Sequence, residues 1–502
     1  MTRSRTATLF IFSALPIFIF GCGPASRSDA DNPTPGSSGV VTDASNDDPN
    51  PIVLENRKSG SDDWLLTKTK INDPSRSLPV EGYCSHVSVR AGEKLSIFVS
   101  TNPVSKFRLD LYRLGYYSGK GGRLMKSFEN VAGKTQPTPE PGPRNVRECQ
   151  WDPSIEFEIP EDWVSGVYLG KLTAEPSGYQ SYVIFVLRDD READFLLQVS
   201  DLTWHAYNRW PGWSSIYDFG DNHWHSGPSN NVSFDRPYAR FINMTAIKWD
   251  DAKPYTGAGS FLFCEFPLAF WMEKEGYDVS YISQVDTHAD GKGLLRAKGF
   301  ISIGHDEYWS RQAFANVTNA RDAGVSLAFL SGNTSVVSVE FDPSSDGRPN
   351  RQYRRSTIYE DEQNLTGAAA YGLGFGDWVC TAPDHWLYEG TDMRQGEKIA
   401  DLIGWEYQAE PLKQDPSLVV VGRGKIADTE PGAPDEFVAT VYDCPKGNFV
   451  FNAATIWWAM PLSTPPGFNN PHRIKSDWTR DDPRVQQMTR NILDRMLKTP
   501  RP

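Results

Sequence analysis

The chain has 502 residues, with 51 Lys and Arg against 64 Asp and Glu, so its formal net charge is −13. This acidic balance without any run of basic residues argues against a nucleic-acid partner, because phosphates need a basic surface, and a mean hydropathy of −0.49 excludes a protein with several membrane spans. The 16 Trp, 20 Tyr and 26 Phe indicate large cores or an aromatic pocket for a small ligand.

The first segment of the chain predicts export. Two Arg residues precede an apolar run over residues 7–20, which has the length of a signal peptide and is short for a membrane span. Gly21 and Cys22 follow directly, and a small residue before a Cys at this place is similar to a bacterial lipobox, in which the Cys is acylated. An ordinary signal peptide with a chance Cys is the alternative. We expect residues 1–21 to be a lipoprotein signal peptide and the exported chain to be anchored in a membrane through Cys22, facing the periplasm or the cell surface.

The next two segments differ in composition. Residues 22–60 are rich in Ser, Asp, Asn, Pro and Gly, so they predict a disordered tether that buries little apolar surface. Residues 61–190 contain short alternating runs such as 95–99 and 107–112, separated by Gly and Pro. This pattern is typical of an antiparallel β-sandwich.

From residue 191 to residue 502 strands alternate with helices. Such alternation builds a parallel sheet covered by helices. The predicted strands are 195–199, 278–282, 300–303, 325–330, 437–442 and 448–452, and the predicted helices are 266–275, 310–323 and 483–497. The fold class is therefore α/β, with an N-terminal β-sandwich.

The cysteines fit an exported protein but form no zinc pattern. Cys84 and Cys149 lie in the predicted sandwich, and Cys380 and Cys444 lie in the α/β part, so each pair could form a disulfide. Cys264 lies in an apolar run, where a buried free thiol is expected.

The segment after strand 300–303 carries His305, Asp306 and Glu307, and Ser310 can cap the next helix. The carboxyl end of a parallel strand is where open α/β sheets bind ligands. The alternative is a solvated turn in which the two acids only favour the helix N-terminus. A second segment, residues 203–218, is dense in Trp, His, Tyr and Asn and follows strand 195–199. It predicts a pocket wall beside the first segment, or else a loop stabilised by its aromatic residues.

Several motifs stand out in the C-terminal part of the sequence. They are Tyr207-Asn208, Trp210-Pro211-Gly212, Tyr217, residues 233–238, residues 304–310, Ser331-Gly332-Asn333, Gly404-Trp405-Glu406 and residues 451–459. Together they resemble the C-terminal domain of the N,N-dimethylformamidase large (beta) subunit family over about residues 190–500. Residues 112–117 also resemble the domain that commonly precedes it. The resemblance implies a three-layer α/β domain similar to class I glutamine amidotransferases, without their nucleophilic Cys.

The resemblance also implies a mononuclear iron (Fe³⁺) held by two tyrosines and one glutamate. By motif, Glu307 is the glutamate and Tyr207 the first tyrosine, whereas Tyr238 is the preferred second tyrosine and Tyr217 the alternative. Phenolate and carboxylate are hard oxygen donors suited to Fe³⁺, and three protein ligands leave positions open for water and substrate.

Three further residues receive roles from the resemblance. His305 and Asn333 would lie beside the metal, and Glu406 is a candidate for a nearby acid or base. The metal would polarise an amide carbonyl and lower the pKa of bound water. His305 could then take or return a proton, and Asn333 could donate to the developing oxyanion.

The leading prediction is an exported, lipid-anchored hydrolase that cleaves a C–N amide bond of a small molecule with a mononuclear iron site. The first alternative is a non-catalytic cell-surface protein that recognises glycan or envelope ligands through an aromatic crevice. The second is a hydrolase that uses the same carboxylates on a glycan. The expected partners are the small-molecule amide and the membrane, and the sequence leaves open a homo-oligomer or a separate small subunit.

Overall fold

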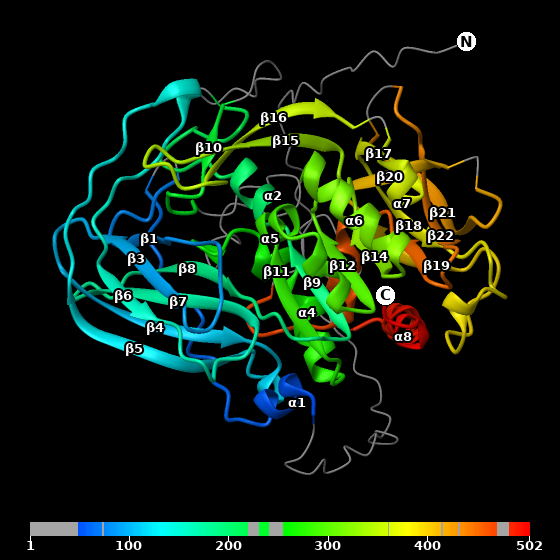
Figure 1. Cartoon of the computed structure of the whole chain (residues 1–502), viewed down its shortest axis with the longest axis horizontal. Helices are drawn as coiled ribbons and strands as arrows, with labels where there is room; N and C mark the ends of the chain where they lie inside the picture. The colour runs from blue at the N-terminus through cyan, green and yellow to red at the C-terminus, as the bar shows by residue number, and fades with distance from the viewer. Residues whose placement is uncertain are drawn as a thin grey trace, which may run out of the picture.

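A computed structural model describes residues 49–72, 75–218, 230–239, 255–359, 361–412, 415–429, 432–468 and 481–502. The predicted signal peptide and Cys22 lie outside these ranges. The chain folds as a mixed α/β structure in which strands outnumber helices (Figure 1). Within the described ranges, no helix combines the length and the hydropathy that a bilayer span requires.

The N-terminal part contains two β-sheets that pack on one apolar core. Alternate residues of one central strand, Leu95, Ile97 and Val99, are buried in this core, as the alternating pattern predicts. The five-stranded sheet has the order β2-β8-β7-β4-β5 and is antiparallel apart from the β2–β8 pair, and the three-stranded sheet has the order β1-β3-β6. The strands are β1 (Glu81–Cys84), β2 (Ser88–Val89), β3 (Lys94–Ser100), β4 (Lys106–Leu114), β5 (Gly122–Ala132), β6 (Ile155–Glu158), β7 (Gly166–Glu175) and β8 (Gln180–Leu187).

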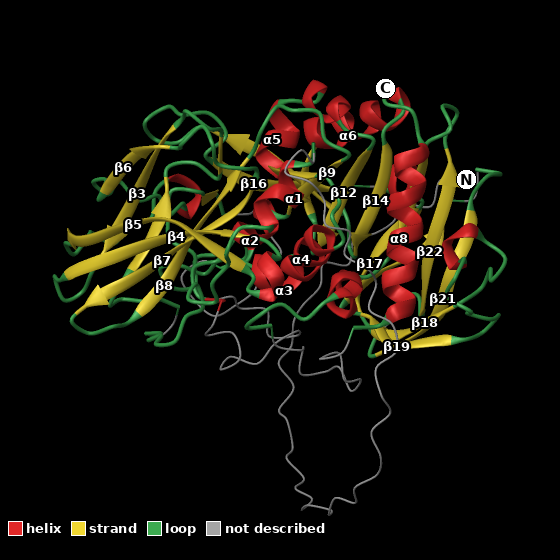
Figure 2. Cartoon of the chain, turned by 90° about the horizontal axis from the view of Figure 1, so that it is seen from below, coloured by secondary structure: helices red, strands yellow, loops and turns green. Residues whose placement is uncertain are grey.

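A nine-stranded sheet forms the centre of the C-terminal part, in the order β11-β9-β12-β14-β23-β22-β21-β18-β19. The strands from β11 to β23 run parallel, and the remaining four pair antiparallel. Figure 2 shows the sandwich at one end of the molecule and this sheet at the other. The strands are β9 (Phe195–Val199), β11 (Val279–Ser283), β12 (Gly299–Gly304), β14 (Ser326–Ser331), β18 (Phe375–Val379), β19 (Lys398–Ile403), β21 (Val419–Ala427), β22 (Glu436–Asp443) and β23 (Phe449–Asn452).

Helices cover both faces of the parallel strands. Leu196 and Phe300 share one apolar cluster with Val317 of α6, whereas the next residues along each strand, Leu197 and Ile301, belong to the cluster of α4 and α8. The three long helices match those predicted from the sequence. The helices are α1 (Pro51–Asn56), α2 (Asp201–Ala206), α3 (Phe261–Cys264), α4 (Phe266–Lys274), α5 (Gln284–Ala289), α6 (Arg311–Ala323), α7 (Gln363–Thr366) and α8 (Pro483–Lys498).

Two smaller sheets and several 3₁₀ turns complete the described fold. One sheet has the order β10-β16-β15-β13, and the other pairs β17 with β20. Their strands are β10 (Val232–Ser233), β13 (Tyr308–Ser310), β15 (Val337–Asp342), β16 (Gln352–Ile358), β17 (Ala368–Leu373) and β20 (Glu406–Pro411). The 3₁₀ turns are η1 (Tyr117–Gly119), η2 (Pro143–Asn145), η4 (Lys292–Arg296), η5 (Trp386–Tyr388) and η6 (Ile456–Leu462).

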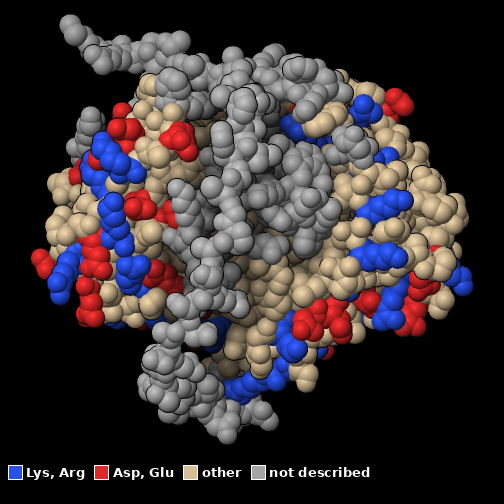
Figure 3. Space-filling model, turned by 180° about the vertical axis from the view of Figure 1, so that it is seen from behind, with Lys and Arg blue, Asp and Glu red and all other residues tan. Residues whose placement is uncertain are grey.

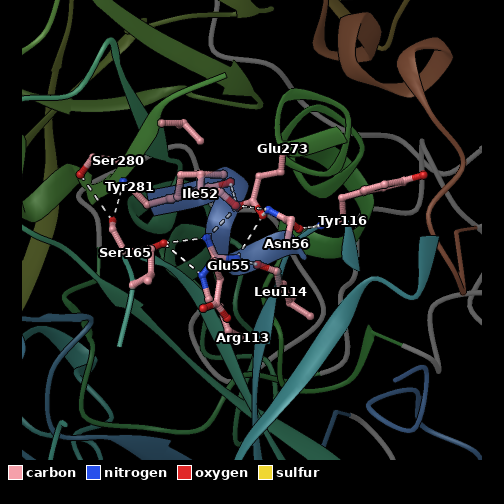
Figure 4. A network of polar contacts seen from close by, with 12 residues as sticks. Ile52, Glu55, Asn56, Arg113, Leu114, Tyr116, Ser165, Glu273, Ser280 and Tyr281 are labelled. Atoms are coloured by element: carbon pink, nitrogen blue, oxygen red, sulfur yellow. Dashed lines mark hydrogen bonds and ion pairs between the residues drawn. The ribbon is translucent and has the colours of Figure 1, made fainter. Parts of the chain in front are cut away.

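The predicted tether is wrong for its last residues, because α1 folds within the range 22–60. Asn50 caps the helix by accepting from the Ile52 amide, and Ile52 is fully buried. Asn56 at the helix end donates to the Glu273 carboxylate of α4 at 2.8 Å. Apolar burial and two Asn side chains therefore anchor a segment whose composition is otherwise typical of disorder, and Figure 4 shows Ile52 and Asn56 of this helix.

A buried ion pair joins the sandwich to the α/β part beside α1. Arg113 of β4 donates from Nη2 to Oε1 of Glu273 at 2.8 Å, and neither side chain is exposed. Tyr281 of β11 donates to the same carboxylate at 2.8 Å, and Arg113 also donates to the Ser165 carbonyl at 2.8 Å. Figure 4 shows these side chains converging from three separate parts of the chain, namely β4, the residue before β7, and the consecutive elements α4 and β11.

The two disulfides that the sequence allowed are not formed, since all five cysteines within the described ranges are free thiols. Cys84 faces the sandwich core, whereas its neighbour Tyr83 and Cys149 belong to a different apolar cluster on the opposite face of β1. Cys380 and Cys444 likewise belong to clusters on opposite faces of the nine-stranded sheet. Sharing a domain therefore did not bring either pair together.

Surface charges of the two signs are mixed on the face that Figure 3 shows. Acidic and basic side chains lie beside one another at both ends of this face. The chain forms exposed ion pairs, such as Lys94 with Glu156 at 2.9 Å. Exposed pairs of this kind contribute little to stability.

Candidate metal centre

The candidate site lies where adjacent parallel strands end. Tyr207 follows β9 and α2, His305 and Glu307 follow β12, and Asn333 follows β14. Because β9, β12 and β14 are parallel neighbours, their carboxyl ends share one edge of the sheet. The structure thus brings together segments that the sequence predicted to share a crevice.

Gly304 makes the turn from β12 into the site possible. Its φ is +71°, and a Cβ atom at this position would lie 2.9 Å from the Cβ of Cys264. A side chain would therefore be strained in conformation and would also clash with a packed neighbour. Cys264 is fully buried and free, as its apolar surroundings predicted.

His305 lies between two carboxylates. Its Nε2 atom is 2.6 Å from Oε2 of Glu406 and 3.1 Å from Oε2 of Glu307. The three side chains offer ligand atoms that all lie within 4.8 Å of one another. The residues are 3%, 5% and 8% exposed in the order His305, Glu307 and Glu406, so the cluster is buried.

Burial and charge oppose each other at these groups. Burial lowers the pKa of His305, but the nearby carboxylates of Glu406 and Glu307 outweigh this effect and raise it to about 10. Burial raises the pKa of Glu406, and contacts with His305 and Asn333 oppose this shift without cancelling it. Two carboxylates around one imidazole make the site favourable for an additional cation.

Three tyrosines surround this cluster. Tyr207 donates its hydroxyl to Oε2 of Glu307 at 2.7 Å, and its ring lies 5.6 Å from the ring of His305. The ring of Tyr217 lies 5.8 Å from that of Tyr207, and its hydroxyl contacts the hydroxyl of Tyr308. Burial and the charge of Glu307 raise the pKa of both Tyr207 and Tyr217, so a cation is needed for either phenol to ionise near neutral pH.

The structure does not bring Tyr238, the preferred second tyrosine, to this cluster. Its ring packs 4.1 Å from the ring of His205 and 6.2 Å from that of Trp204. The charges that act on its hydroxyl are those of Asp201, Tyr353, Arg236 and Glu265 rather than that of Glu307. On geometry we therefore replace Tyr238 by the alternative, Tyr217.

The donor set fits a metal ion. Nε2 of His305 and Oε2 of Glu406 are buried and close, yet neither makes an aligned hydrogen bond. Two phenols and two carboxylates are hard oxygen donors, and imidazole is a common nitrogen donor. The chemistry of these groups is that of a site for a hard cation.

The aromatic segment that was predicted as a pocket wall is largely core. Trp204 is nearly buried and donates to the Glu265 carboxylate at 2.7 Å. Trp210 is fully buried, donates to Glu81 at 3.0 Å, and packs against Trp151 of the N-terminal part. These two rings pack in the core and hold residues 203–218 in place, but they do not line the site.

Two residues of the site had no predicted role. Tyr308 belongs to the quoted motif, but its contact with Tyr217 depends on tertiary folding. Arg355 of β16 lies 4.4 Å from the centre of the Tyr217 ring, and its charge favours the ionised form of that phenol. The signal for Arg355 in the sequence is weak, because Arg354 stands directly beside it in β16 and nothing in the sequence distinguishes the two.

Comparisons with known proteins point to one family. No curated protein sequence matches the chain. Among solved structures, an alkylpurine DNA glycosylase AlkC from Pseudomonas fluorescens bound to DNA with an abasic site analog is 15% identical over 22% of this chain and 31% of that chain, with a TM-score of 0.15. A family 123 glycoside hydrolase from Clostridium perfringens is 11% identical over 26% of this chain and 31% of that chain, with a TM-score of 0.10.

The chain spans only about a third of the length of each of these two structures, and likeness at such TM-scores carries no functional argument. The family model covers far more of the chain than either structure does, because it matches residues 108–473, which is more than half of the chain. The match begins within β4 and ends beyond η6, so it covers most of the sandwich as well as the α/β part with the candidate site. The chain therefore belongs to the family described as N,N-dimethylformamidase beta subunit-like, C-terminal.

Proposed function

We propose that this protein is a metal-dependent hydrolase that cleaves a C–N amide bond in a small molecule. The observation that carries the proposal is the buried cluster of His305, Glu307 and Glu406 with the Tyr207 hydroxyl bonded to Glu307. Membership of the dimethylformamidase-like family supports hydrolase chemistry. No contact in the described residues favours the glycan-binding alternative.

Within this proposal, Tyr207, Tyr217 and Glu307 hold a mononuclear Fe³⁺. The Tyr207 hydroxyl lies 2.7 Å from Glu307, and the ring of Tyr217 lies 5.8 Å from the ring of Tyr207. Anionic oxygen ligands suit a hard trivalent ion, and three protein ligands leave coordination positions open. When bound, the ion supplies a Lewis acid that polarises a carbonyl and lowers the pKa of water.

The remaining residues act on protons and on the developing charge. His305 Nε2 lies 2.6 Å from Glu406 Oε2, so a proton can pass between them once the imidazole and the carboxylate align. Glu406 also accepts a hydrogen bond from Asn333, so Asn333 and His305 both contact the same carboxylate. Asn333 supplies amide hydrogens that can stabilise the oxyanion of a tetrahedral intermediate, and His305 returns a proton to the leaving amine.

Metal analysis tests the ligand set. The purified protein should contain about one iron per chain and absorb visible light through a tyrosinate-to-iron charge-transfer band. Glu307→Ala, Tyr207→Phe and Tyr217→Phe should each lose iron, whereas Tyr238→Phe serves as the matched control and should retain it. A metal-free, colourless protein that hydrolyses no amide would refute the proposal, and loss of iron in Tyr238→Phe would overturn the choice of Tyr217.

We also propose that the chain is exported and anchored through Cys22. The support is the sequence alone, with an apolar run over residues 7–20 directly before Gly21 and Cys22. A cell that expresses the protein should incorporate labelled fatty acid into it and retain it in the membrane fraction. Cys22→Ser should abolish both, and unchanged labelling of this variant would contradict the anchor.

A further inference from the structure

The middle residue of the His-Asp-Glu segment points away from the candidate site. The carboxylate of Asp306 is fully buried beneath the turn. Its Oδ2 atom accepts from Gln198 at 2.8 Å and from Ser302 at 2.6 Å, and its Oδ1 atom accepts from Trp309 at 2.9 Å and from Gln284 at 2.6 Å. Asp306 therefore anchors the segment to the sheet while its two neighbours face the site.

Gln284, the first residue of α5, uses every polar atom of its side chain. Its Nε2 atom donates both to Asp306 Oδ1 at 2.6 Å and to the Tyr308 carbonyl at 2.7 Å. Its Oε1 atom accepts from the Leu202 amide at 2.9 Å, and its own backbone amide donates to Asp201 at 2.7 Å. The residue is almost completely buried, so water cannot replace these partners.

The two segments that Gln284 connects carry proposed ligands. Leu202 belongs to the first turn of α2, and Tyr207 follows the last residue of that helix. Asp306 and Tyr308 flank Glu307 in the segment after β12. The connection is short and direct, because one carboxamide contacts both segments.

One further hydrogen bond ties the same segments. The amide of Glu307 donates to the Thr203 hydroxyl of α2 at 3.1 Å. This bond and the Gln284 carboxamide together hold α2 against the turn after β12. Tyr207 directly follows that helix and Glu307 lies in that turn, so their 2.7 Å contact depends on how the two segments are held.

We propose that Gln284 is a positioning residue that sets the distance between Tyr207 and Glu307, and that it thereby tunes the metal affinity and the reaction of the site; this inference rests on the proposed function. Only a carboxamide of this length supplies two donors to the turn and one acceptor to the helix. Glutamate lacks the donors and would place a second carboxylate beside Asp306, and methionine lacks all three groups. Supporting residues of this kind typically change metal affinity or activity by about 10- to 100-fold.

The test compares Gln284→Met with a matched control in the purified full-length protein. Gln136 is also a buried glutamine, and its side chain donates to the Asp152 carbonyl at 2.8 Å, but it lies in the N-terminal part, so Gln136→Met is the control. Hydrogen exchange of peptides covering α2 and residues 304–309 should accelerate at least about tenfold in Gln284→Met and stay unchanged in the control. Gln284→Asn keeps the amide on a shorter side chain, so it should show the same acceleration more weakly. This variant replaces Gln284→Met in the test if the methionine variant does not fold.

Metal readouts then separate positioning from stability alone. Gln284→Met should bind Fe³⁺ at least about tenfold more weakly and shift the visible band, with kcat reduced more than KM increases. Unchanged exchange in these peptides overturns the inference, and so does accelerated exchange with wild-type iron affinity and spectrum. The exchange measurement needs no metal, so it judges the connection between the segments even if the wild-type protein takes up no iron, a result that would refute the proposed function alone.

Discussion

The ion pair between Arg113 and Glu273 makes a strong prediction about stability. Both side chains are unexposed, and four hydrogen bonds end on the Glu273 carboxylate, two from Arg113 and one each from Asn56 and Tyr281. Glu273→Leu removes the acceptor and leaves the guanidinium buried without this partner. The variant should be markedly less stable than the wild-type protein.

The structure sets the size of this loss. Four hydrogen bonds to a charged group, taken at the low figure of about 1.5 kcal/mol each, sum to about 6 kcal/mol if none is replaced. Arg113 keeps its bond to the Ser165 carbonyl and Asn56 keeps its bond to the Ile52 carbonyl, so part of the network survives. Removal of one partner from a buried pair commonly costs roughly 3–5 kcal/mol, which is the loss that we expect.

Equilibrium unfolding in urea, followed by circular dichroism, measures this loss. Glu275→Leu is the control, because Glu275 lies just after the same helix and forms a partly exposed pair with Arg490 at 3.0 Å. It should cost less than about 1 kcal/mol. Combining Glu273→Leu with Arg113→Met should recover much of the stability, since two apolar side chains can replace a buried pair. The reasoning fails if Glu273→Leu unfolds like the control, or if the double variant loses as much as the sum of the single ones.

Three further predictions concern acid stability, the turn and the thiols. Burial raises the pKa of Glu55, but Arg113 and other basic neighbours outweigh this effect and lower the pKa from 4.5 to about 2. Because the pKa in the folded state is the lower one, about 3 kcal/mol of stability is present above pH 4.5 and is lost as the pH falls towards 2. Glu55→Gln should therefore weaken the dependence of the free energy of unfolding on pH in this acid range, as measured by urea unfolding. Gly304→Ala should destabilise the protein by roughly 1–3 kcal/mol in the same assay, since φ there is +71° and the new Cβ would meet Cys264, and an unchanged midpoint would contradict the strained turn. Alkylation of the unreduced, denatured protein should modify all five described cysteines, and peptide mapping that finds a disulfide would contradict their separation.

Local patterns predicted most of the elements that carry the site. The strand before residues 305–307, the helix after Ser310 and their parallel arrangement follow from apolar runs and a capping residue. The Ser310 hydroxyl indeed accepts from the Ala313 amide at 3.0 Å. A strand and its following turn are local features, so one sequence is enough to find them.

The contacts between distant segments could not be predicted in the same way. Tyr217 and Tyr238 are both tyrosines that follow β9, and only the tertiary fold turns one towards Glu307 and packs the other against His205. Glu406 comes from β20, which pairs with β17 outside the nine-stranded sheet, so no periodic pattern links it to His305. Its place in the site was implied by resemblance alone.

The Arg113–Glu273 ion pair between the sandwich and the α/β part is also connected to the candidate site through one strand, β11. Glu273 accepts from Tyr281 of β11, the Tyr281 amide donates to the Ser165 hydroxyl at 3.0 Å, and β11 leads directly into Gln284. The sandwich therefore supports the strand that presents Gln284 to the helix and the turn of the site. If so, Glu273→Leu should accelerate hydrogen exchange in α2 as well as in β11, while the control at the end of α4 leaves α2 unchanged. Faster exchange confined to β4, α4 and β11 would show instead that the sandwich stabilises the fold without reaching the site.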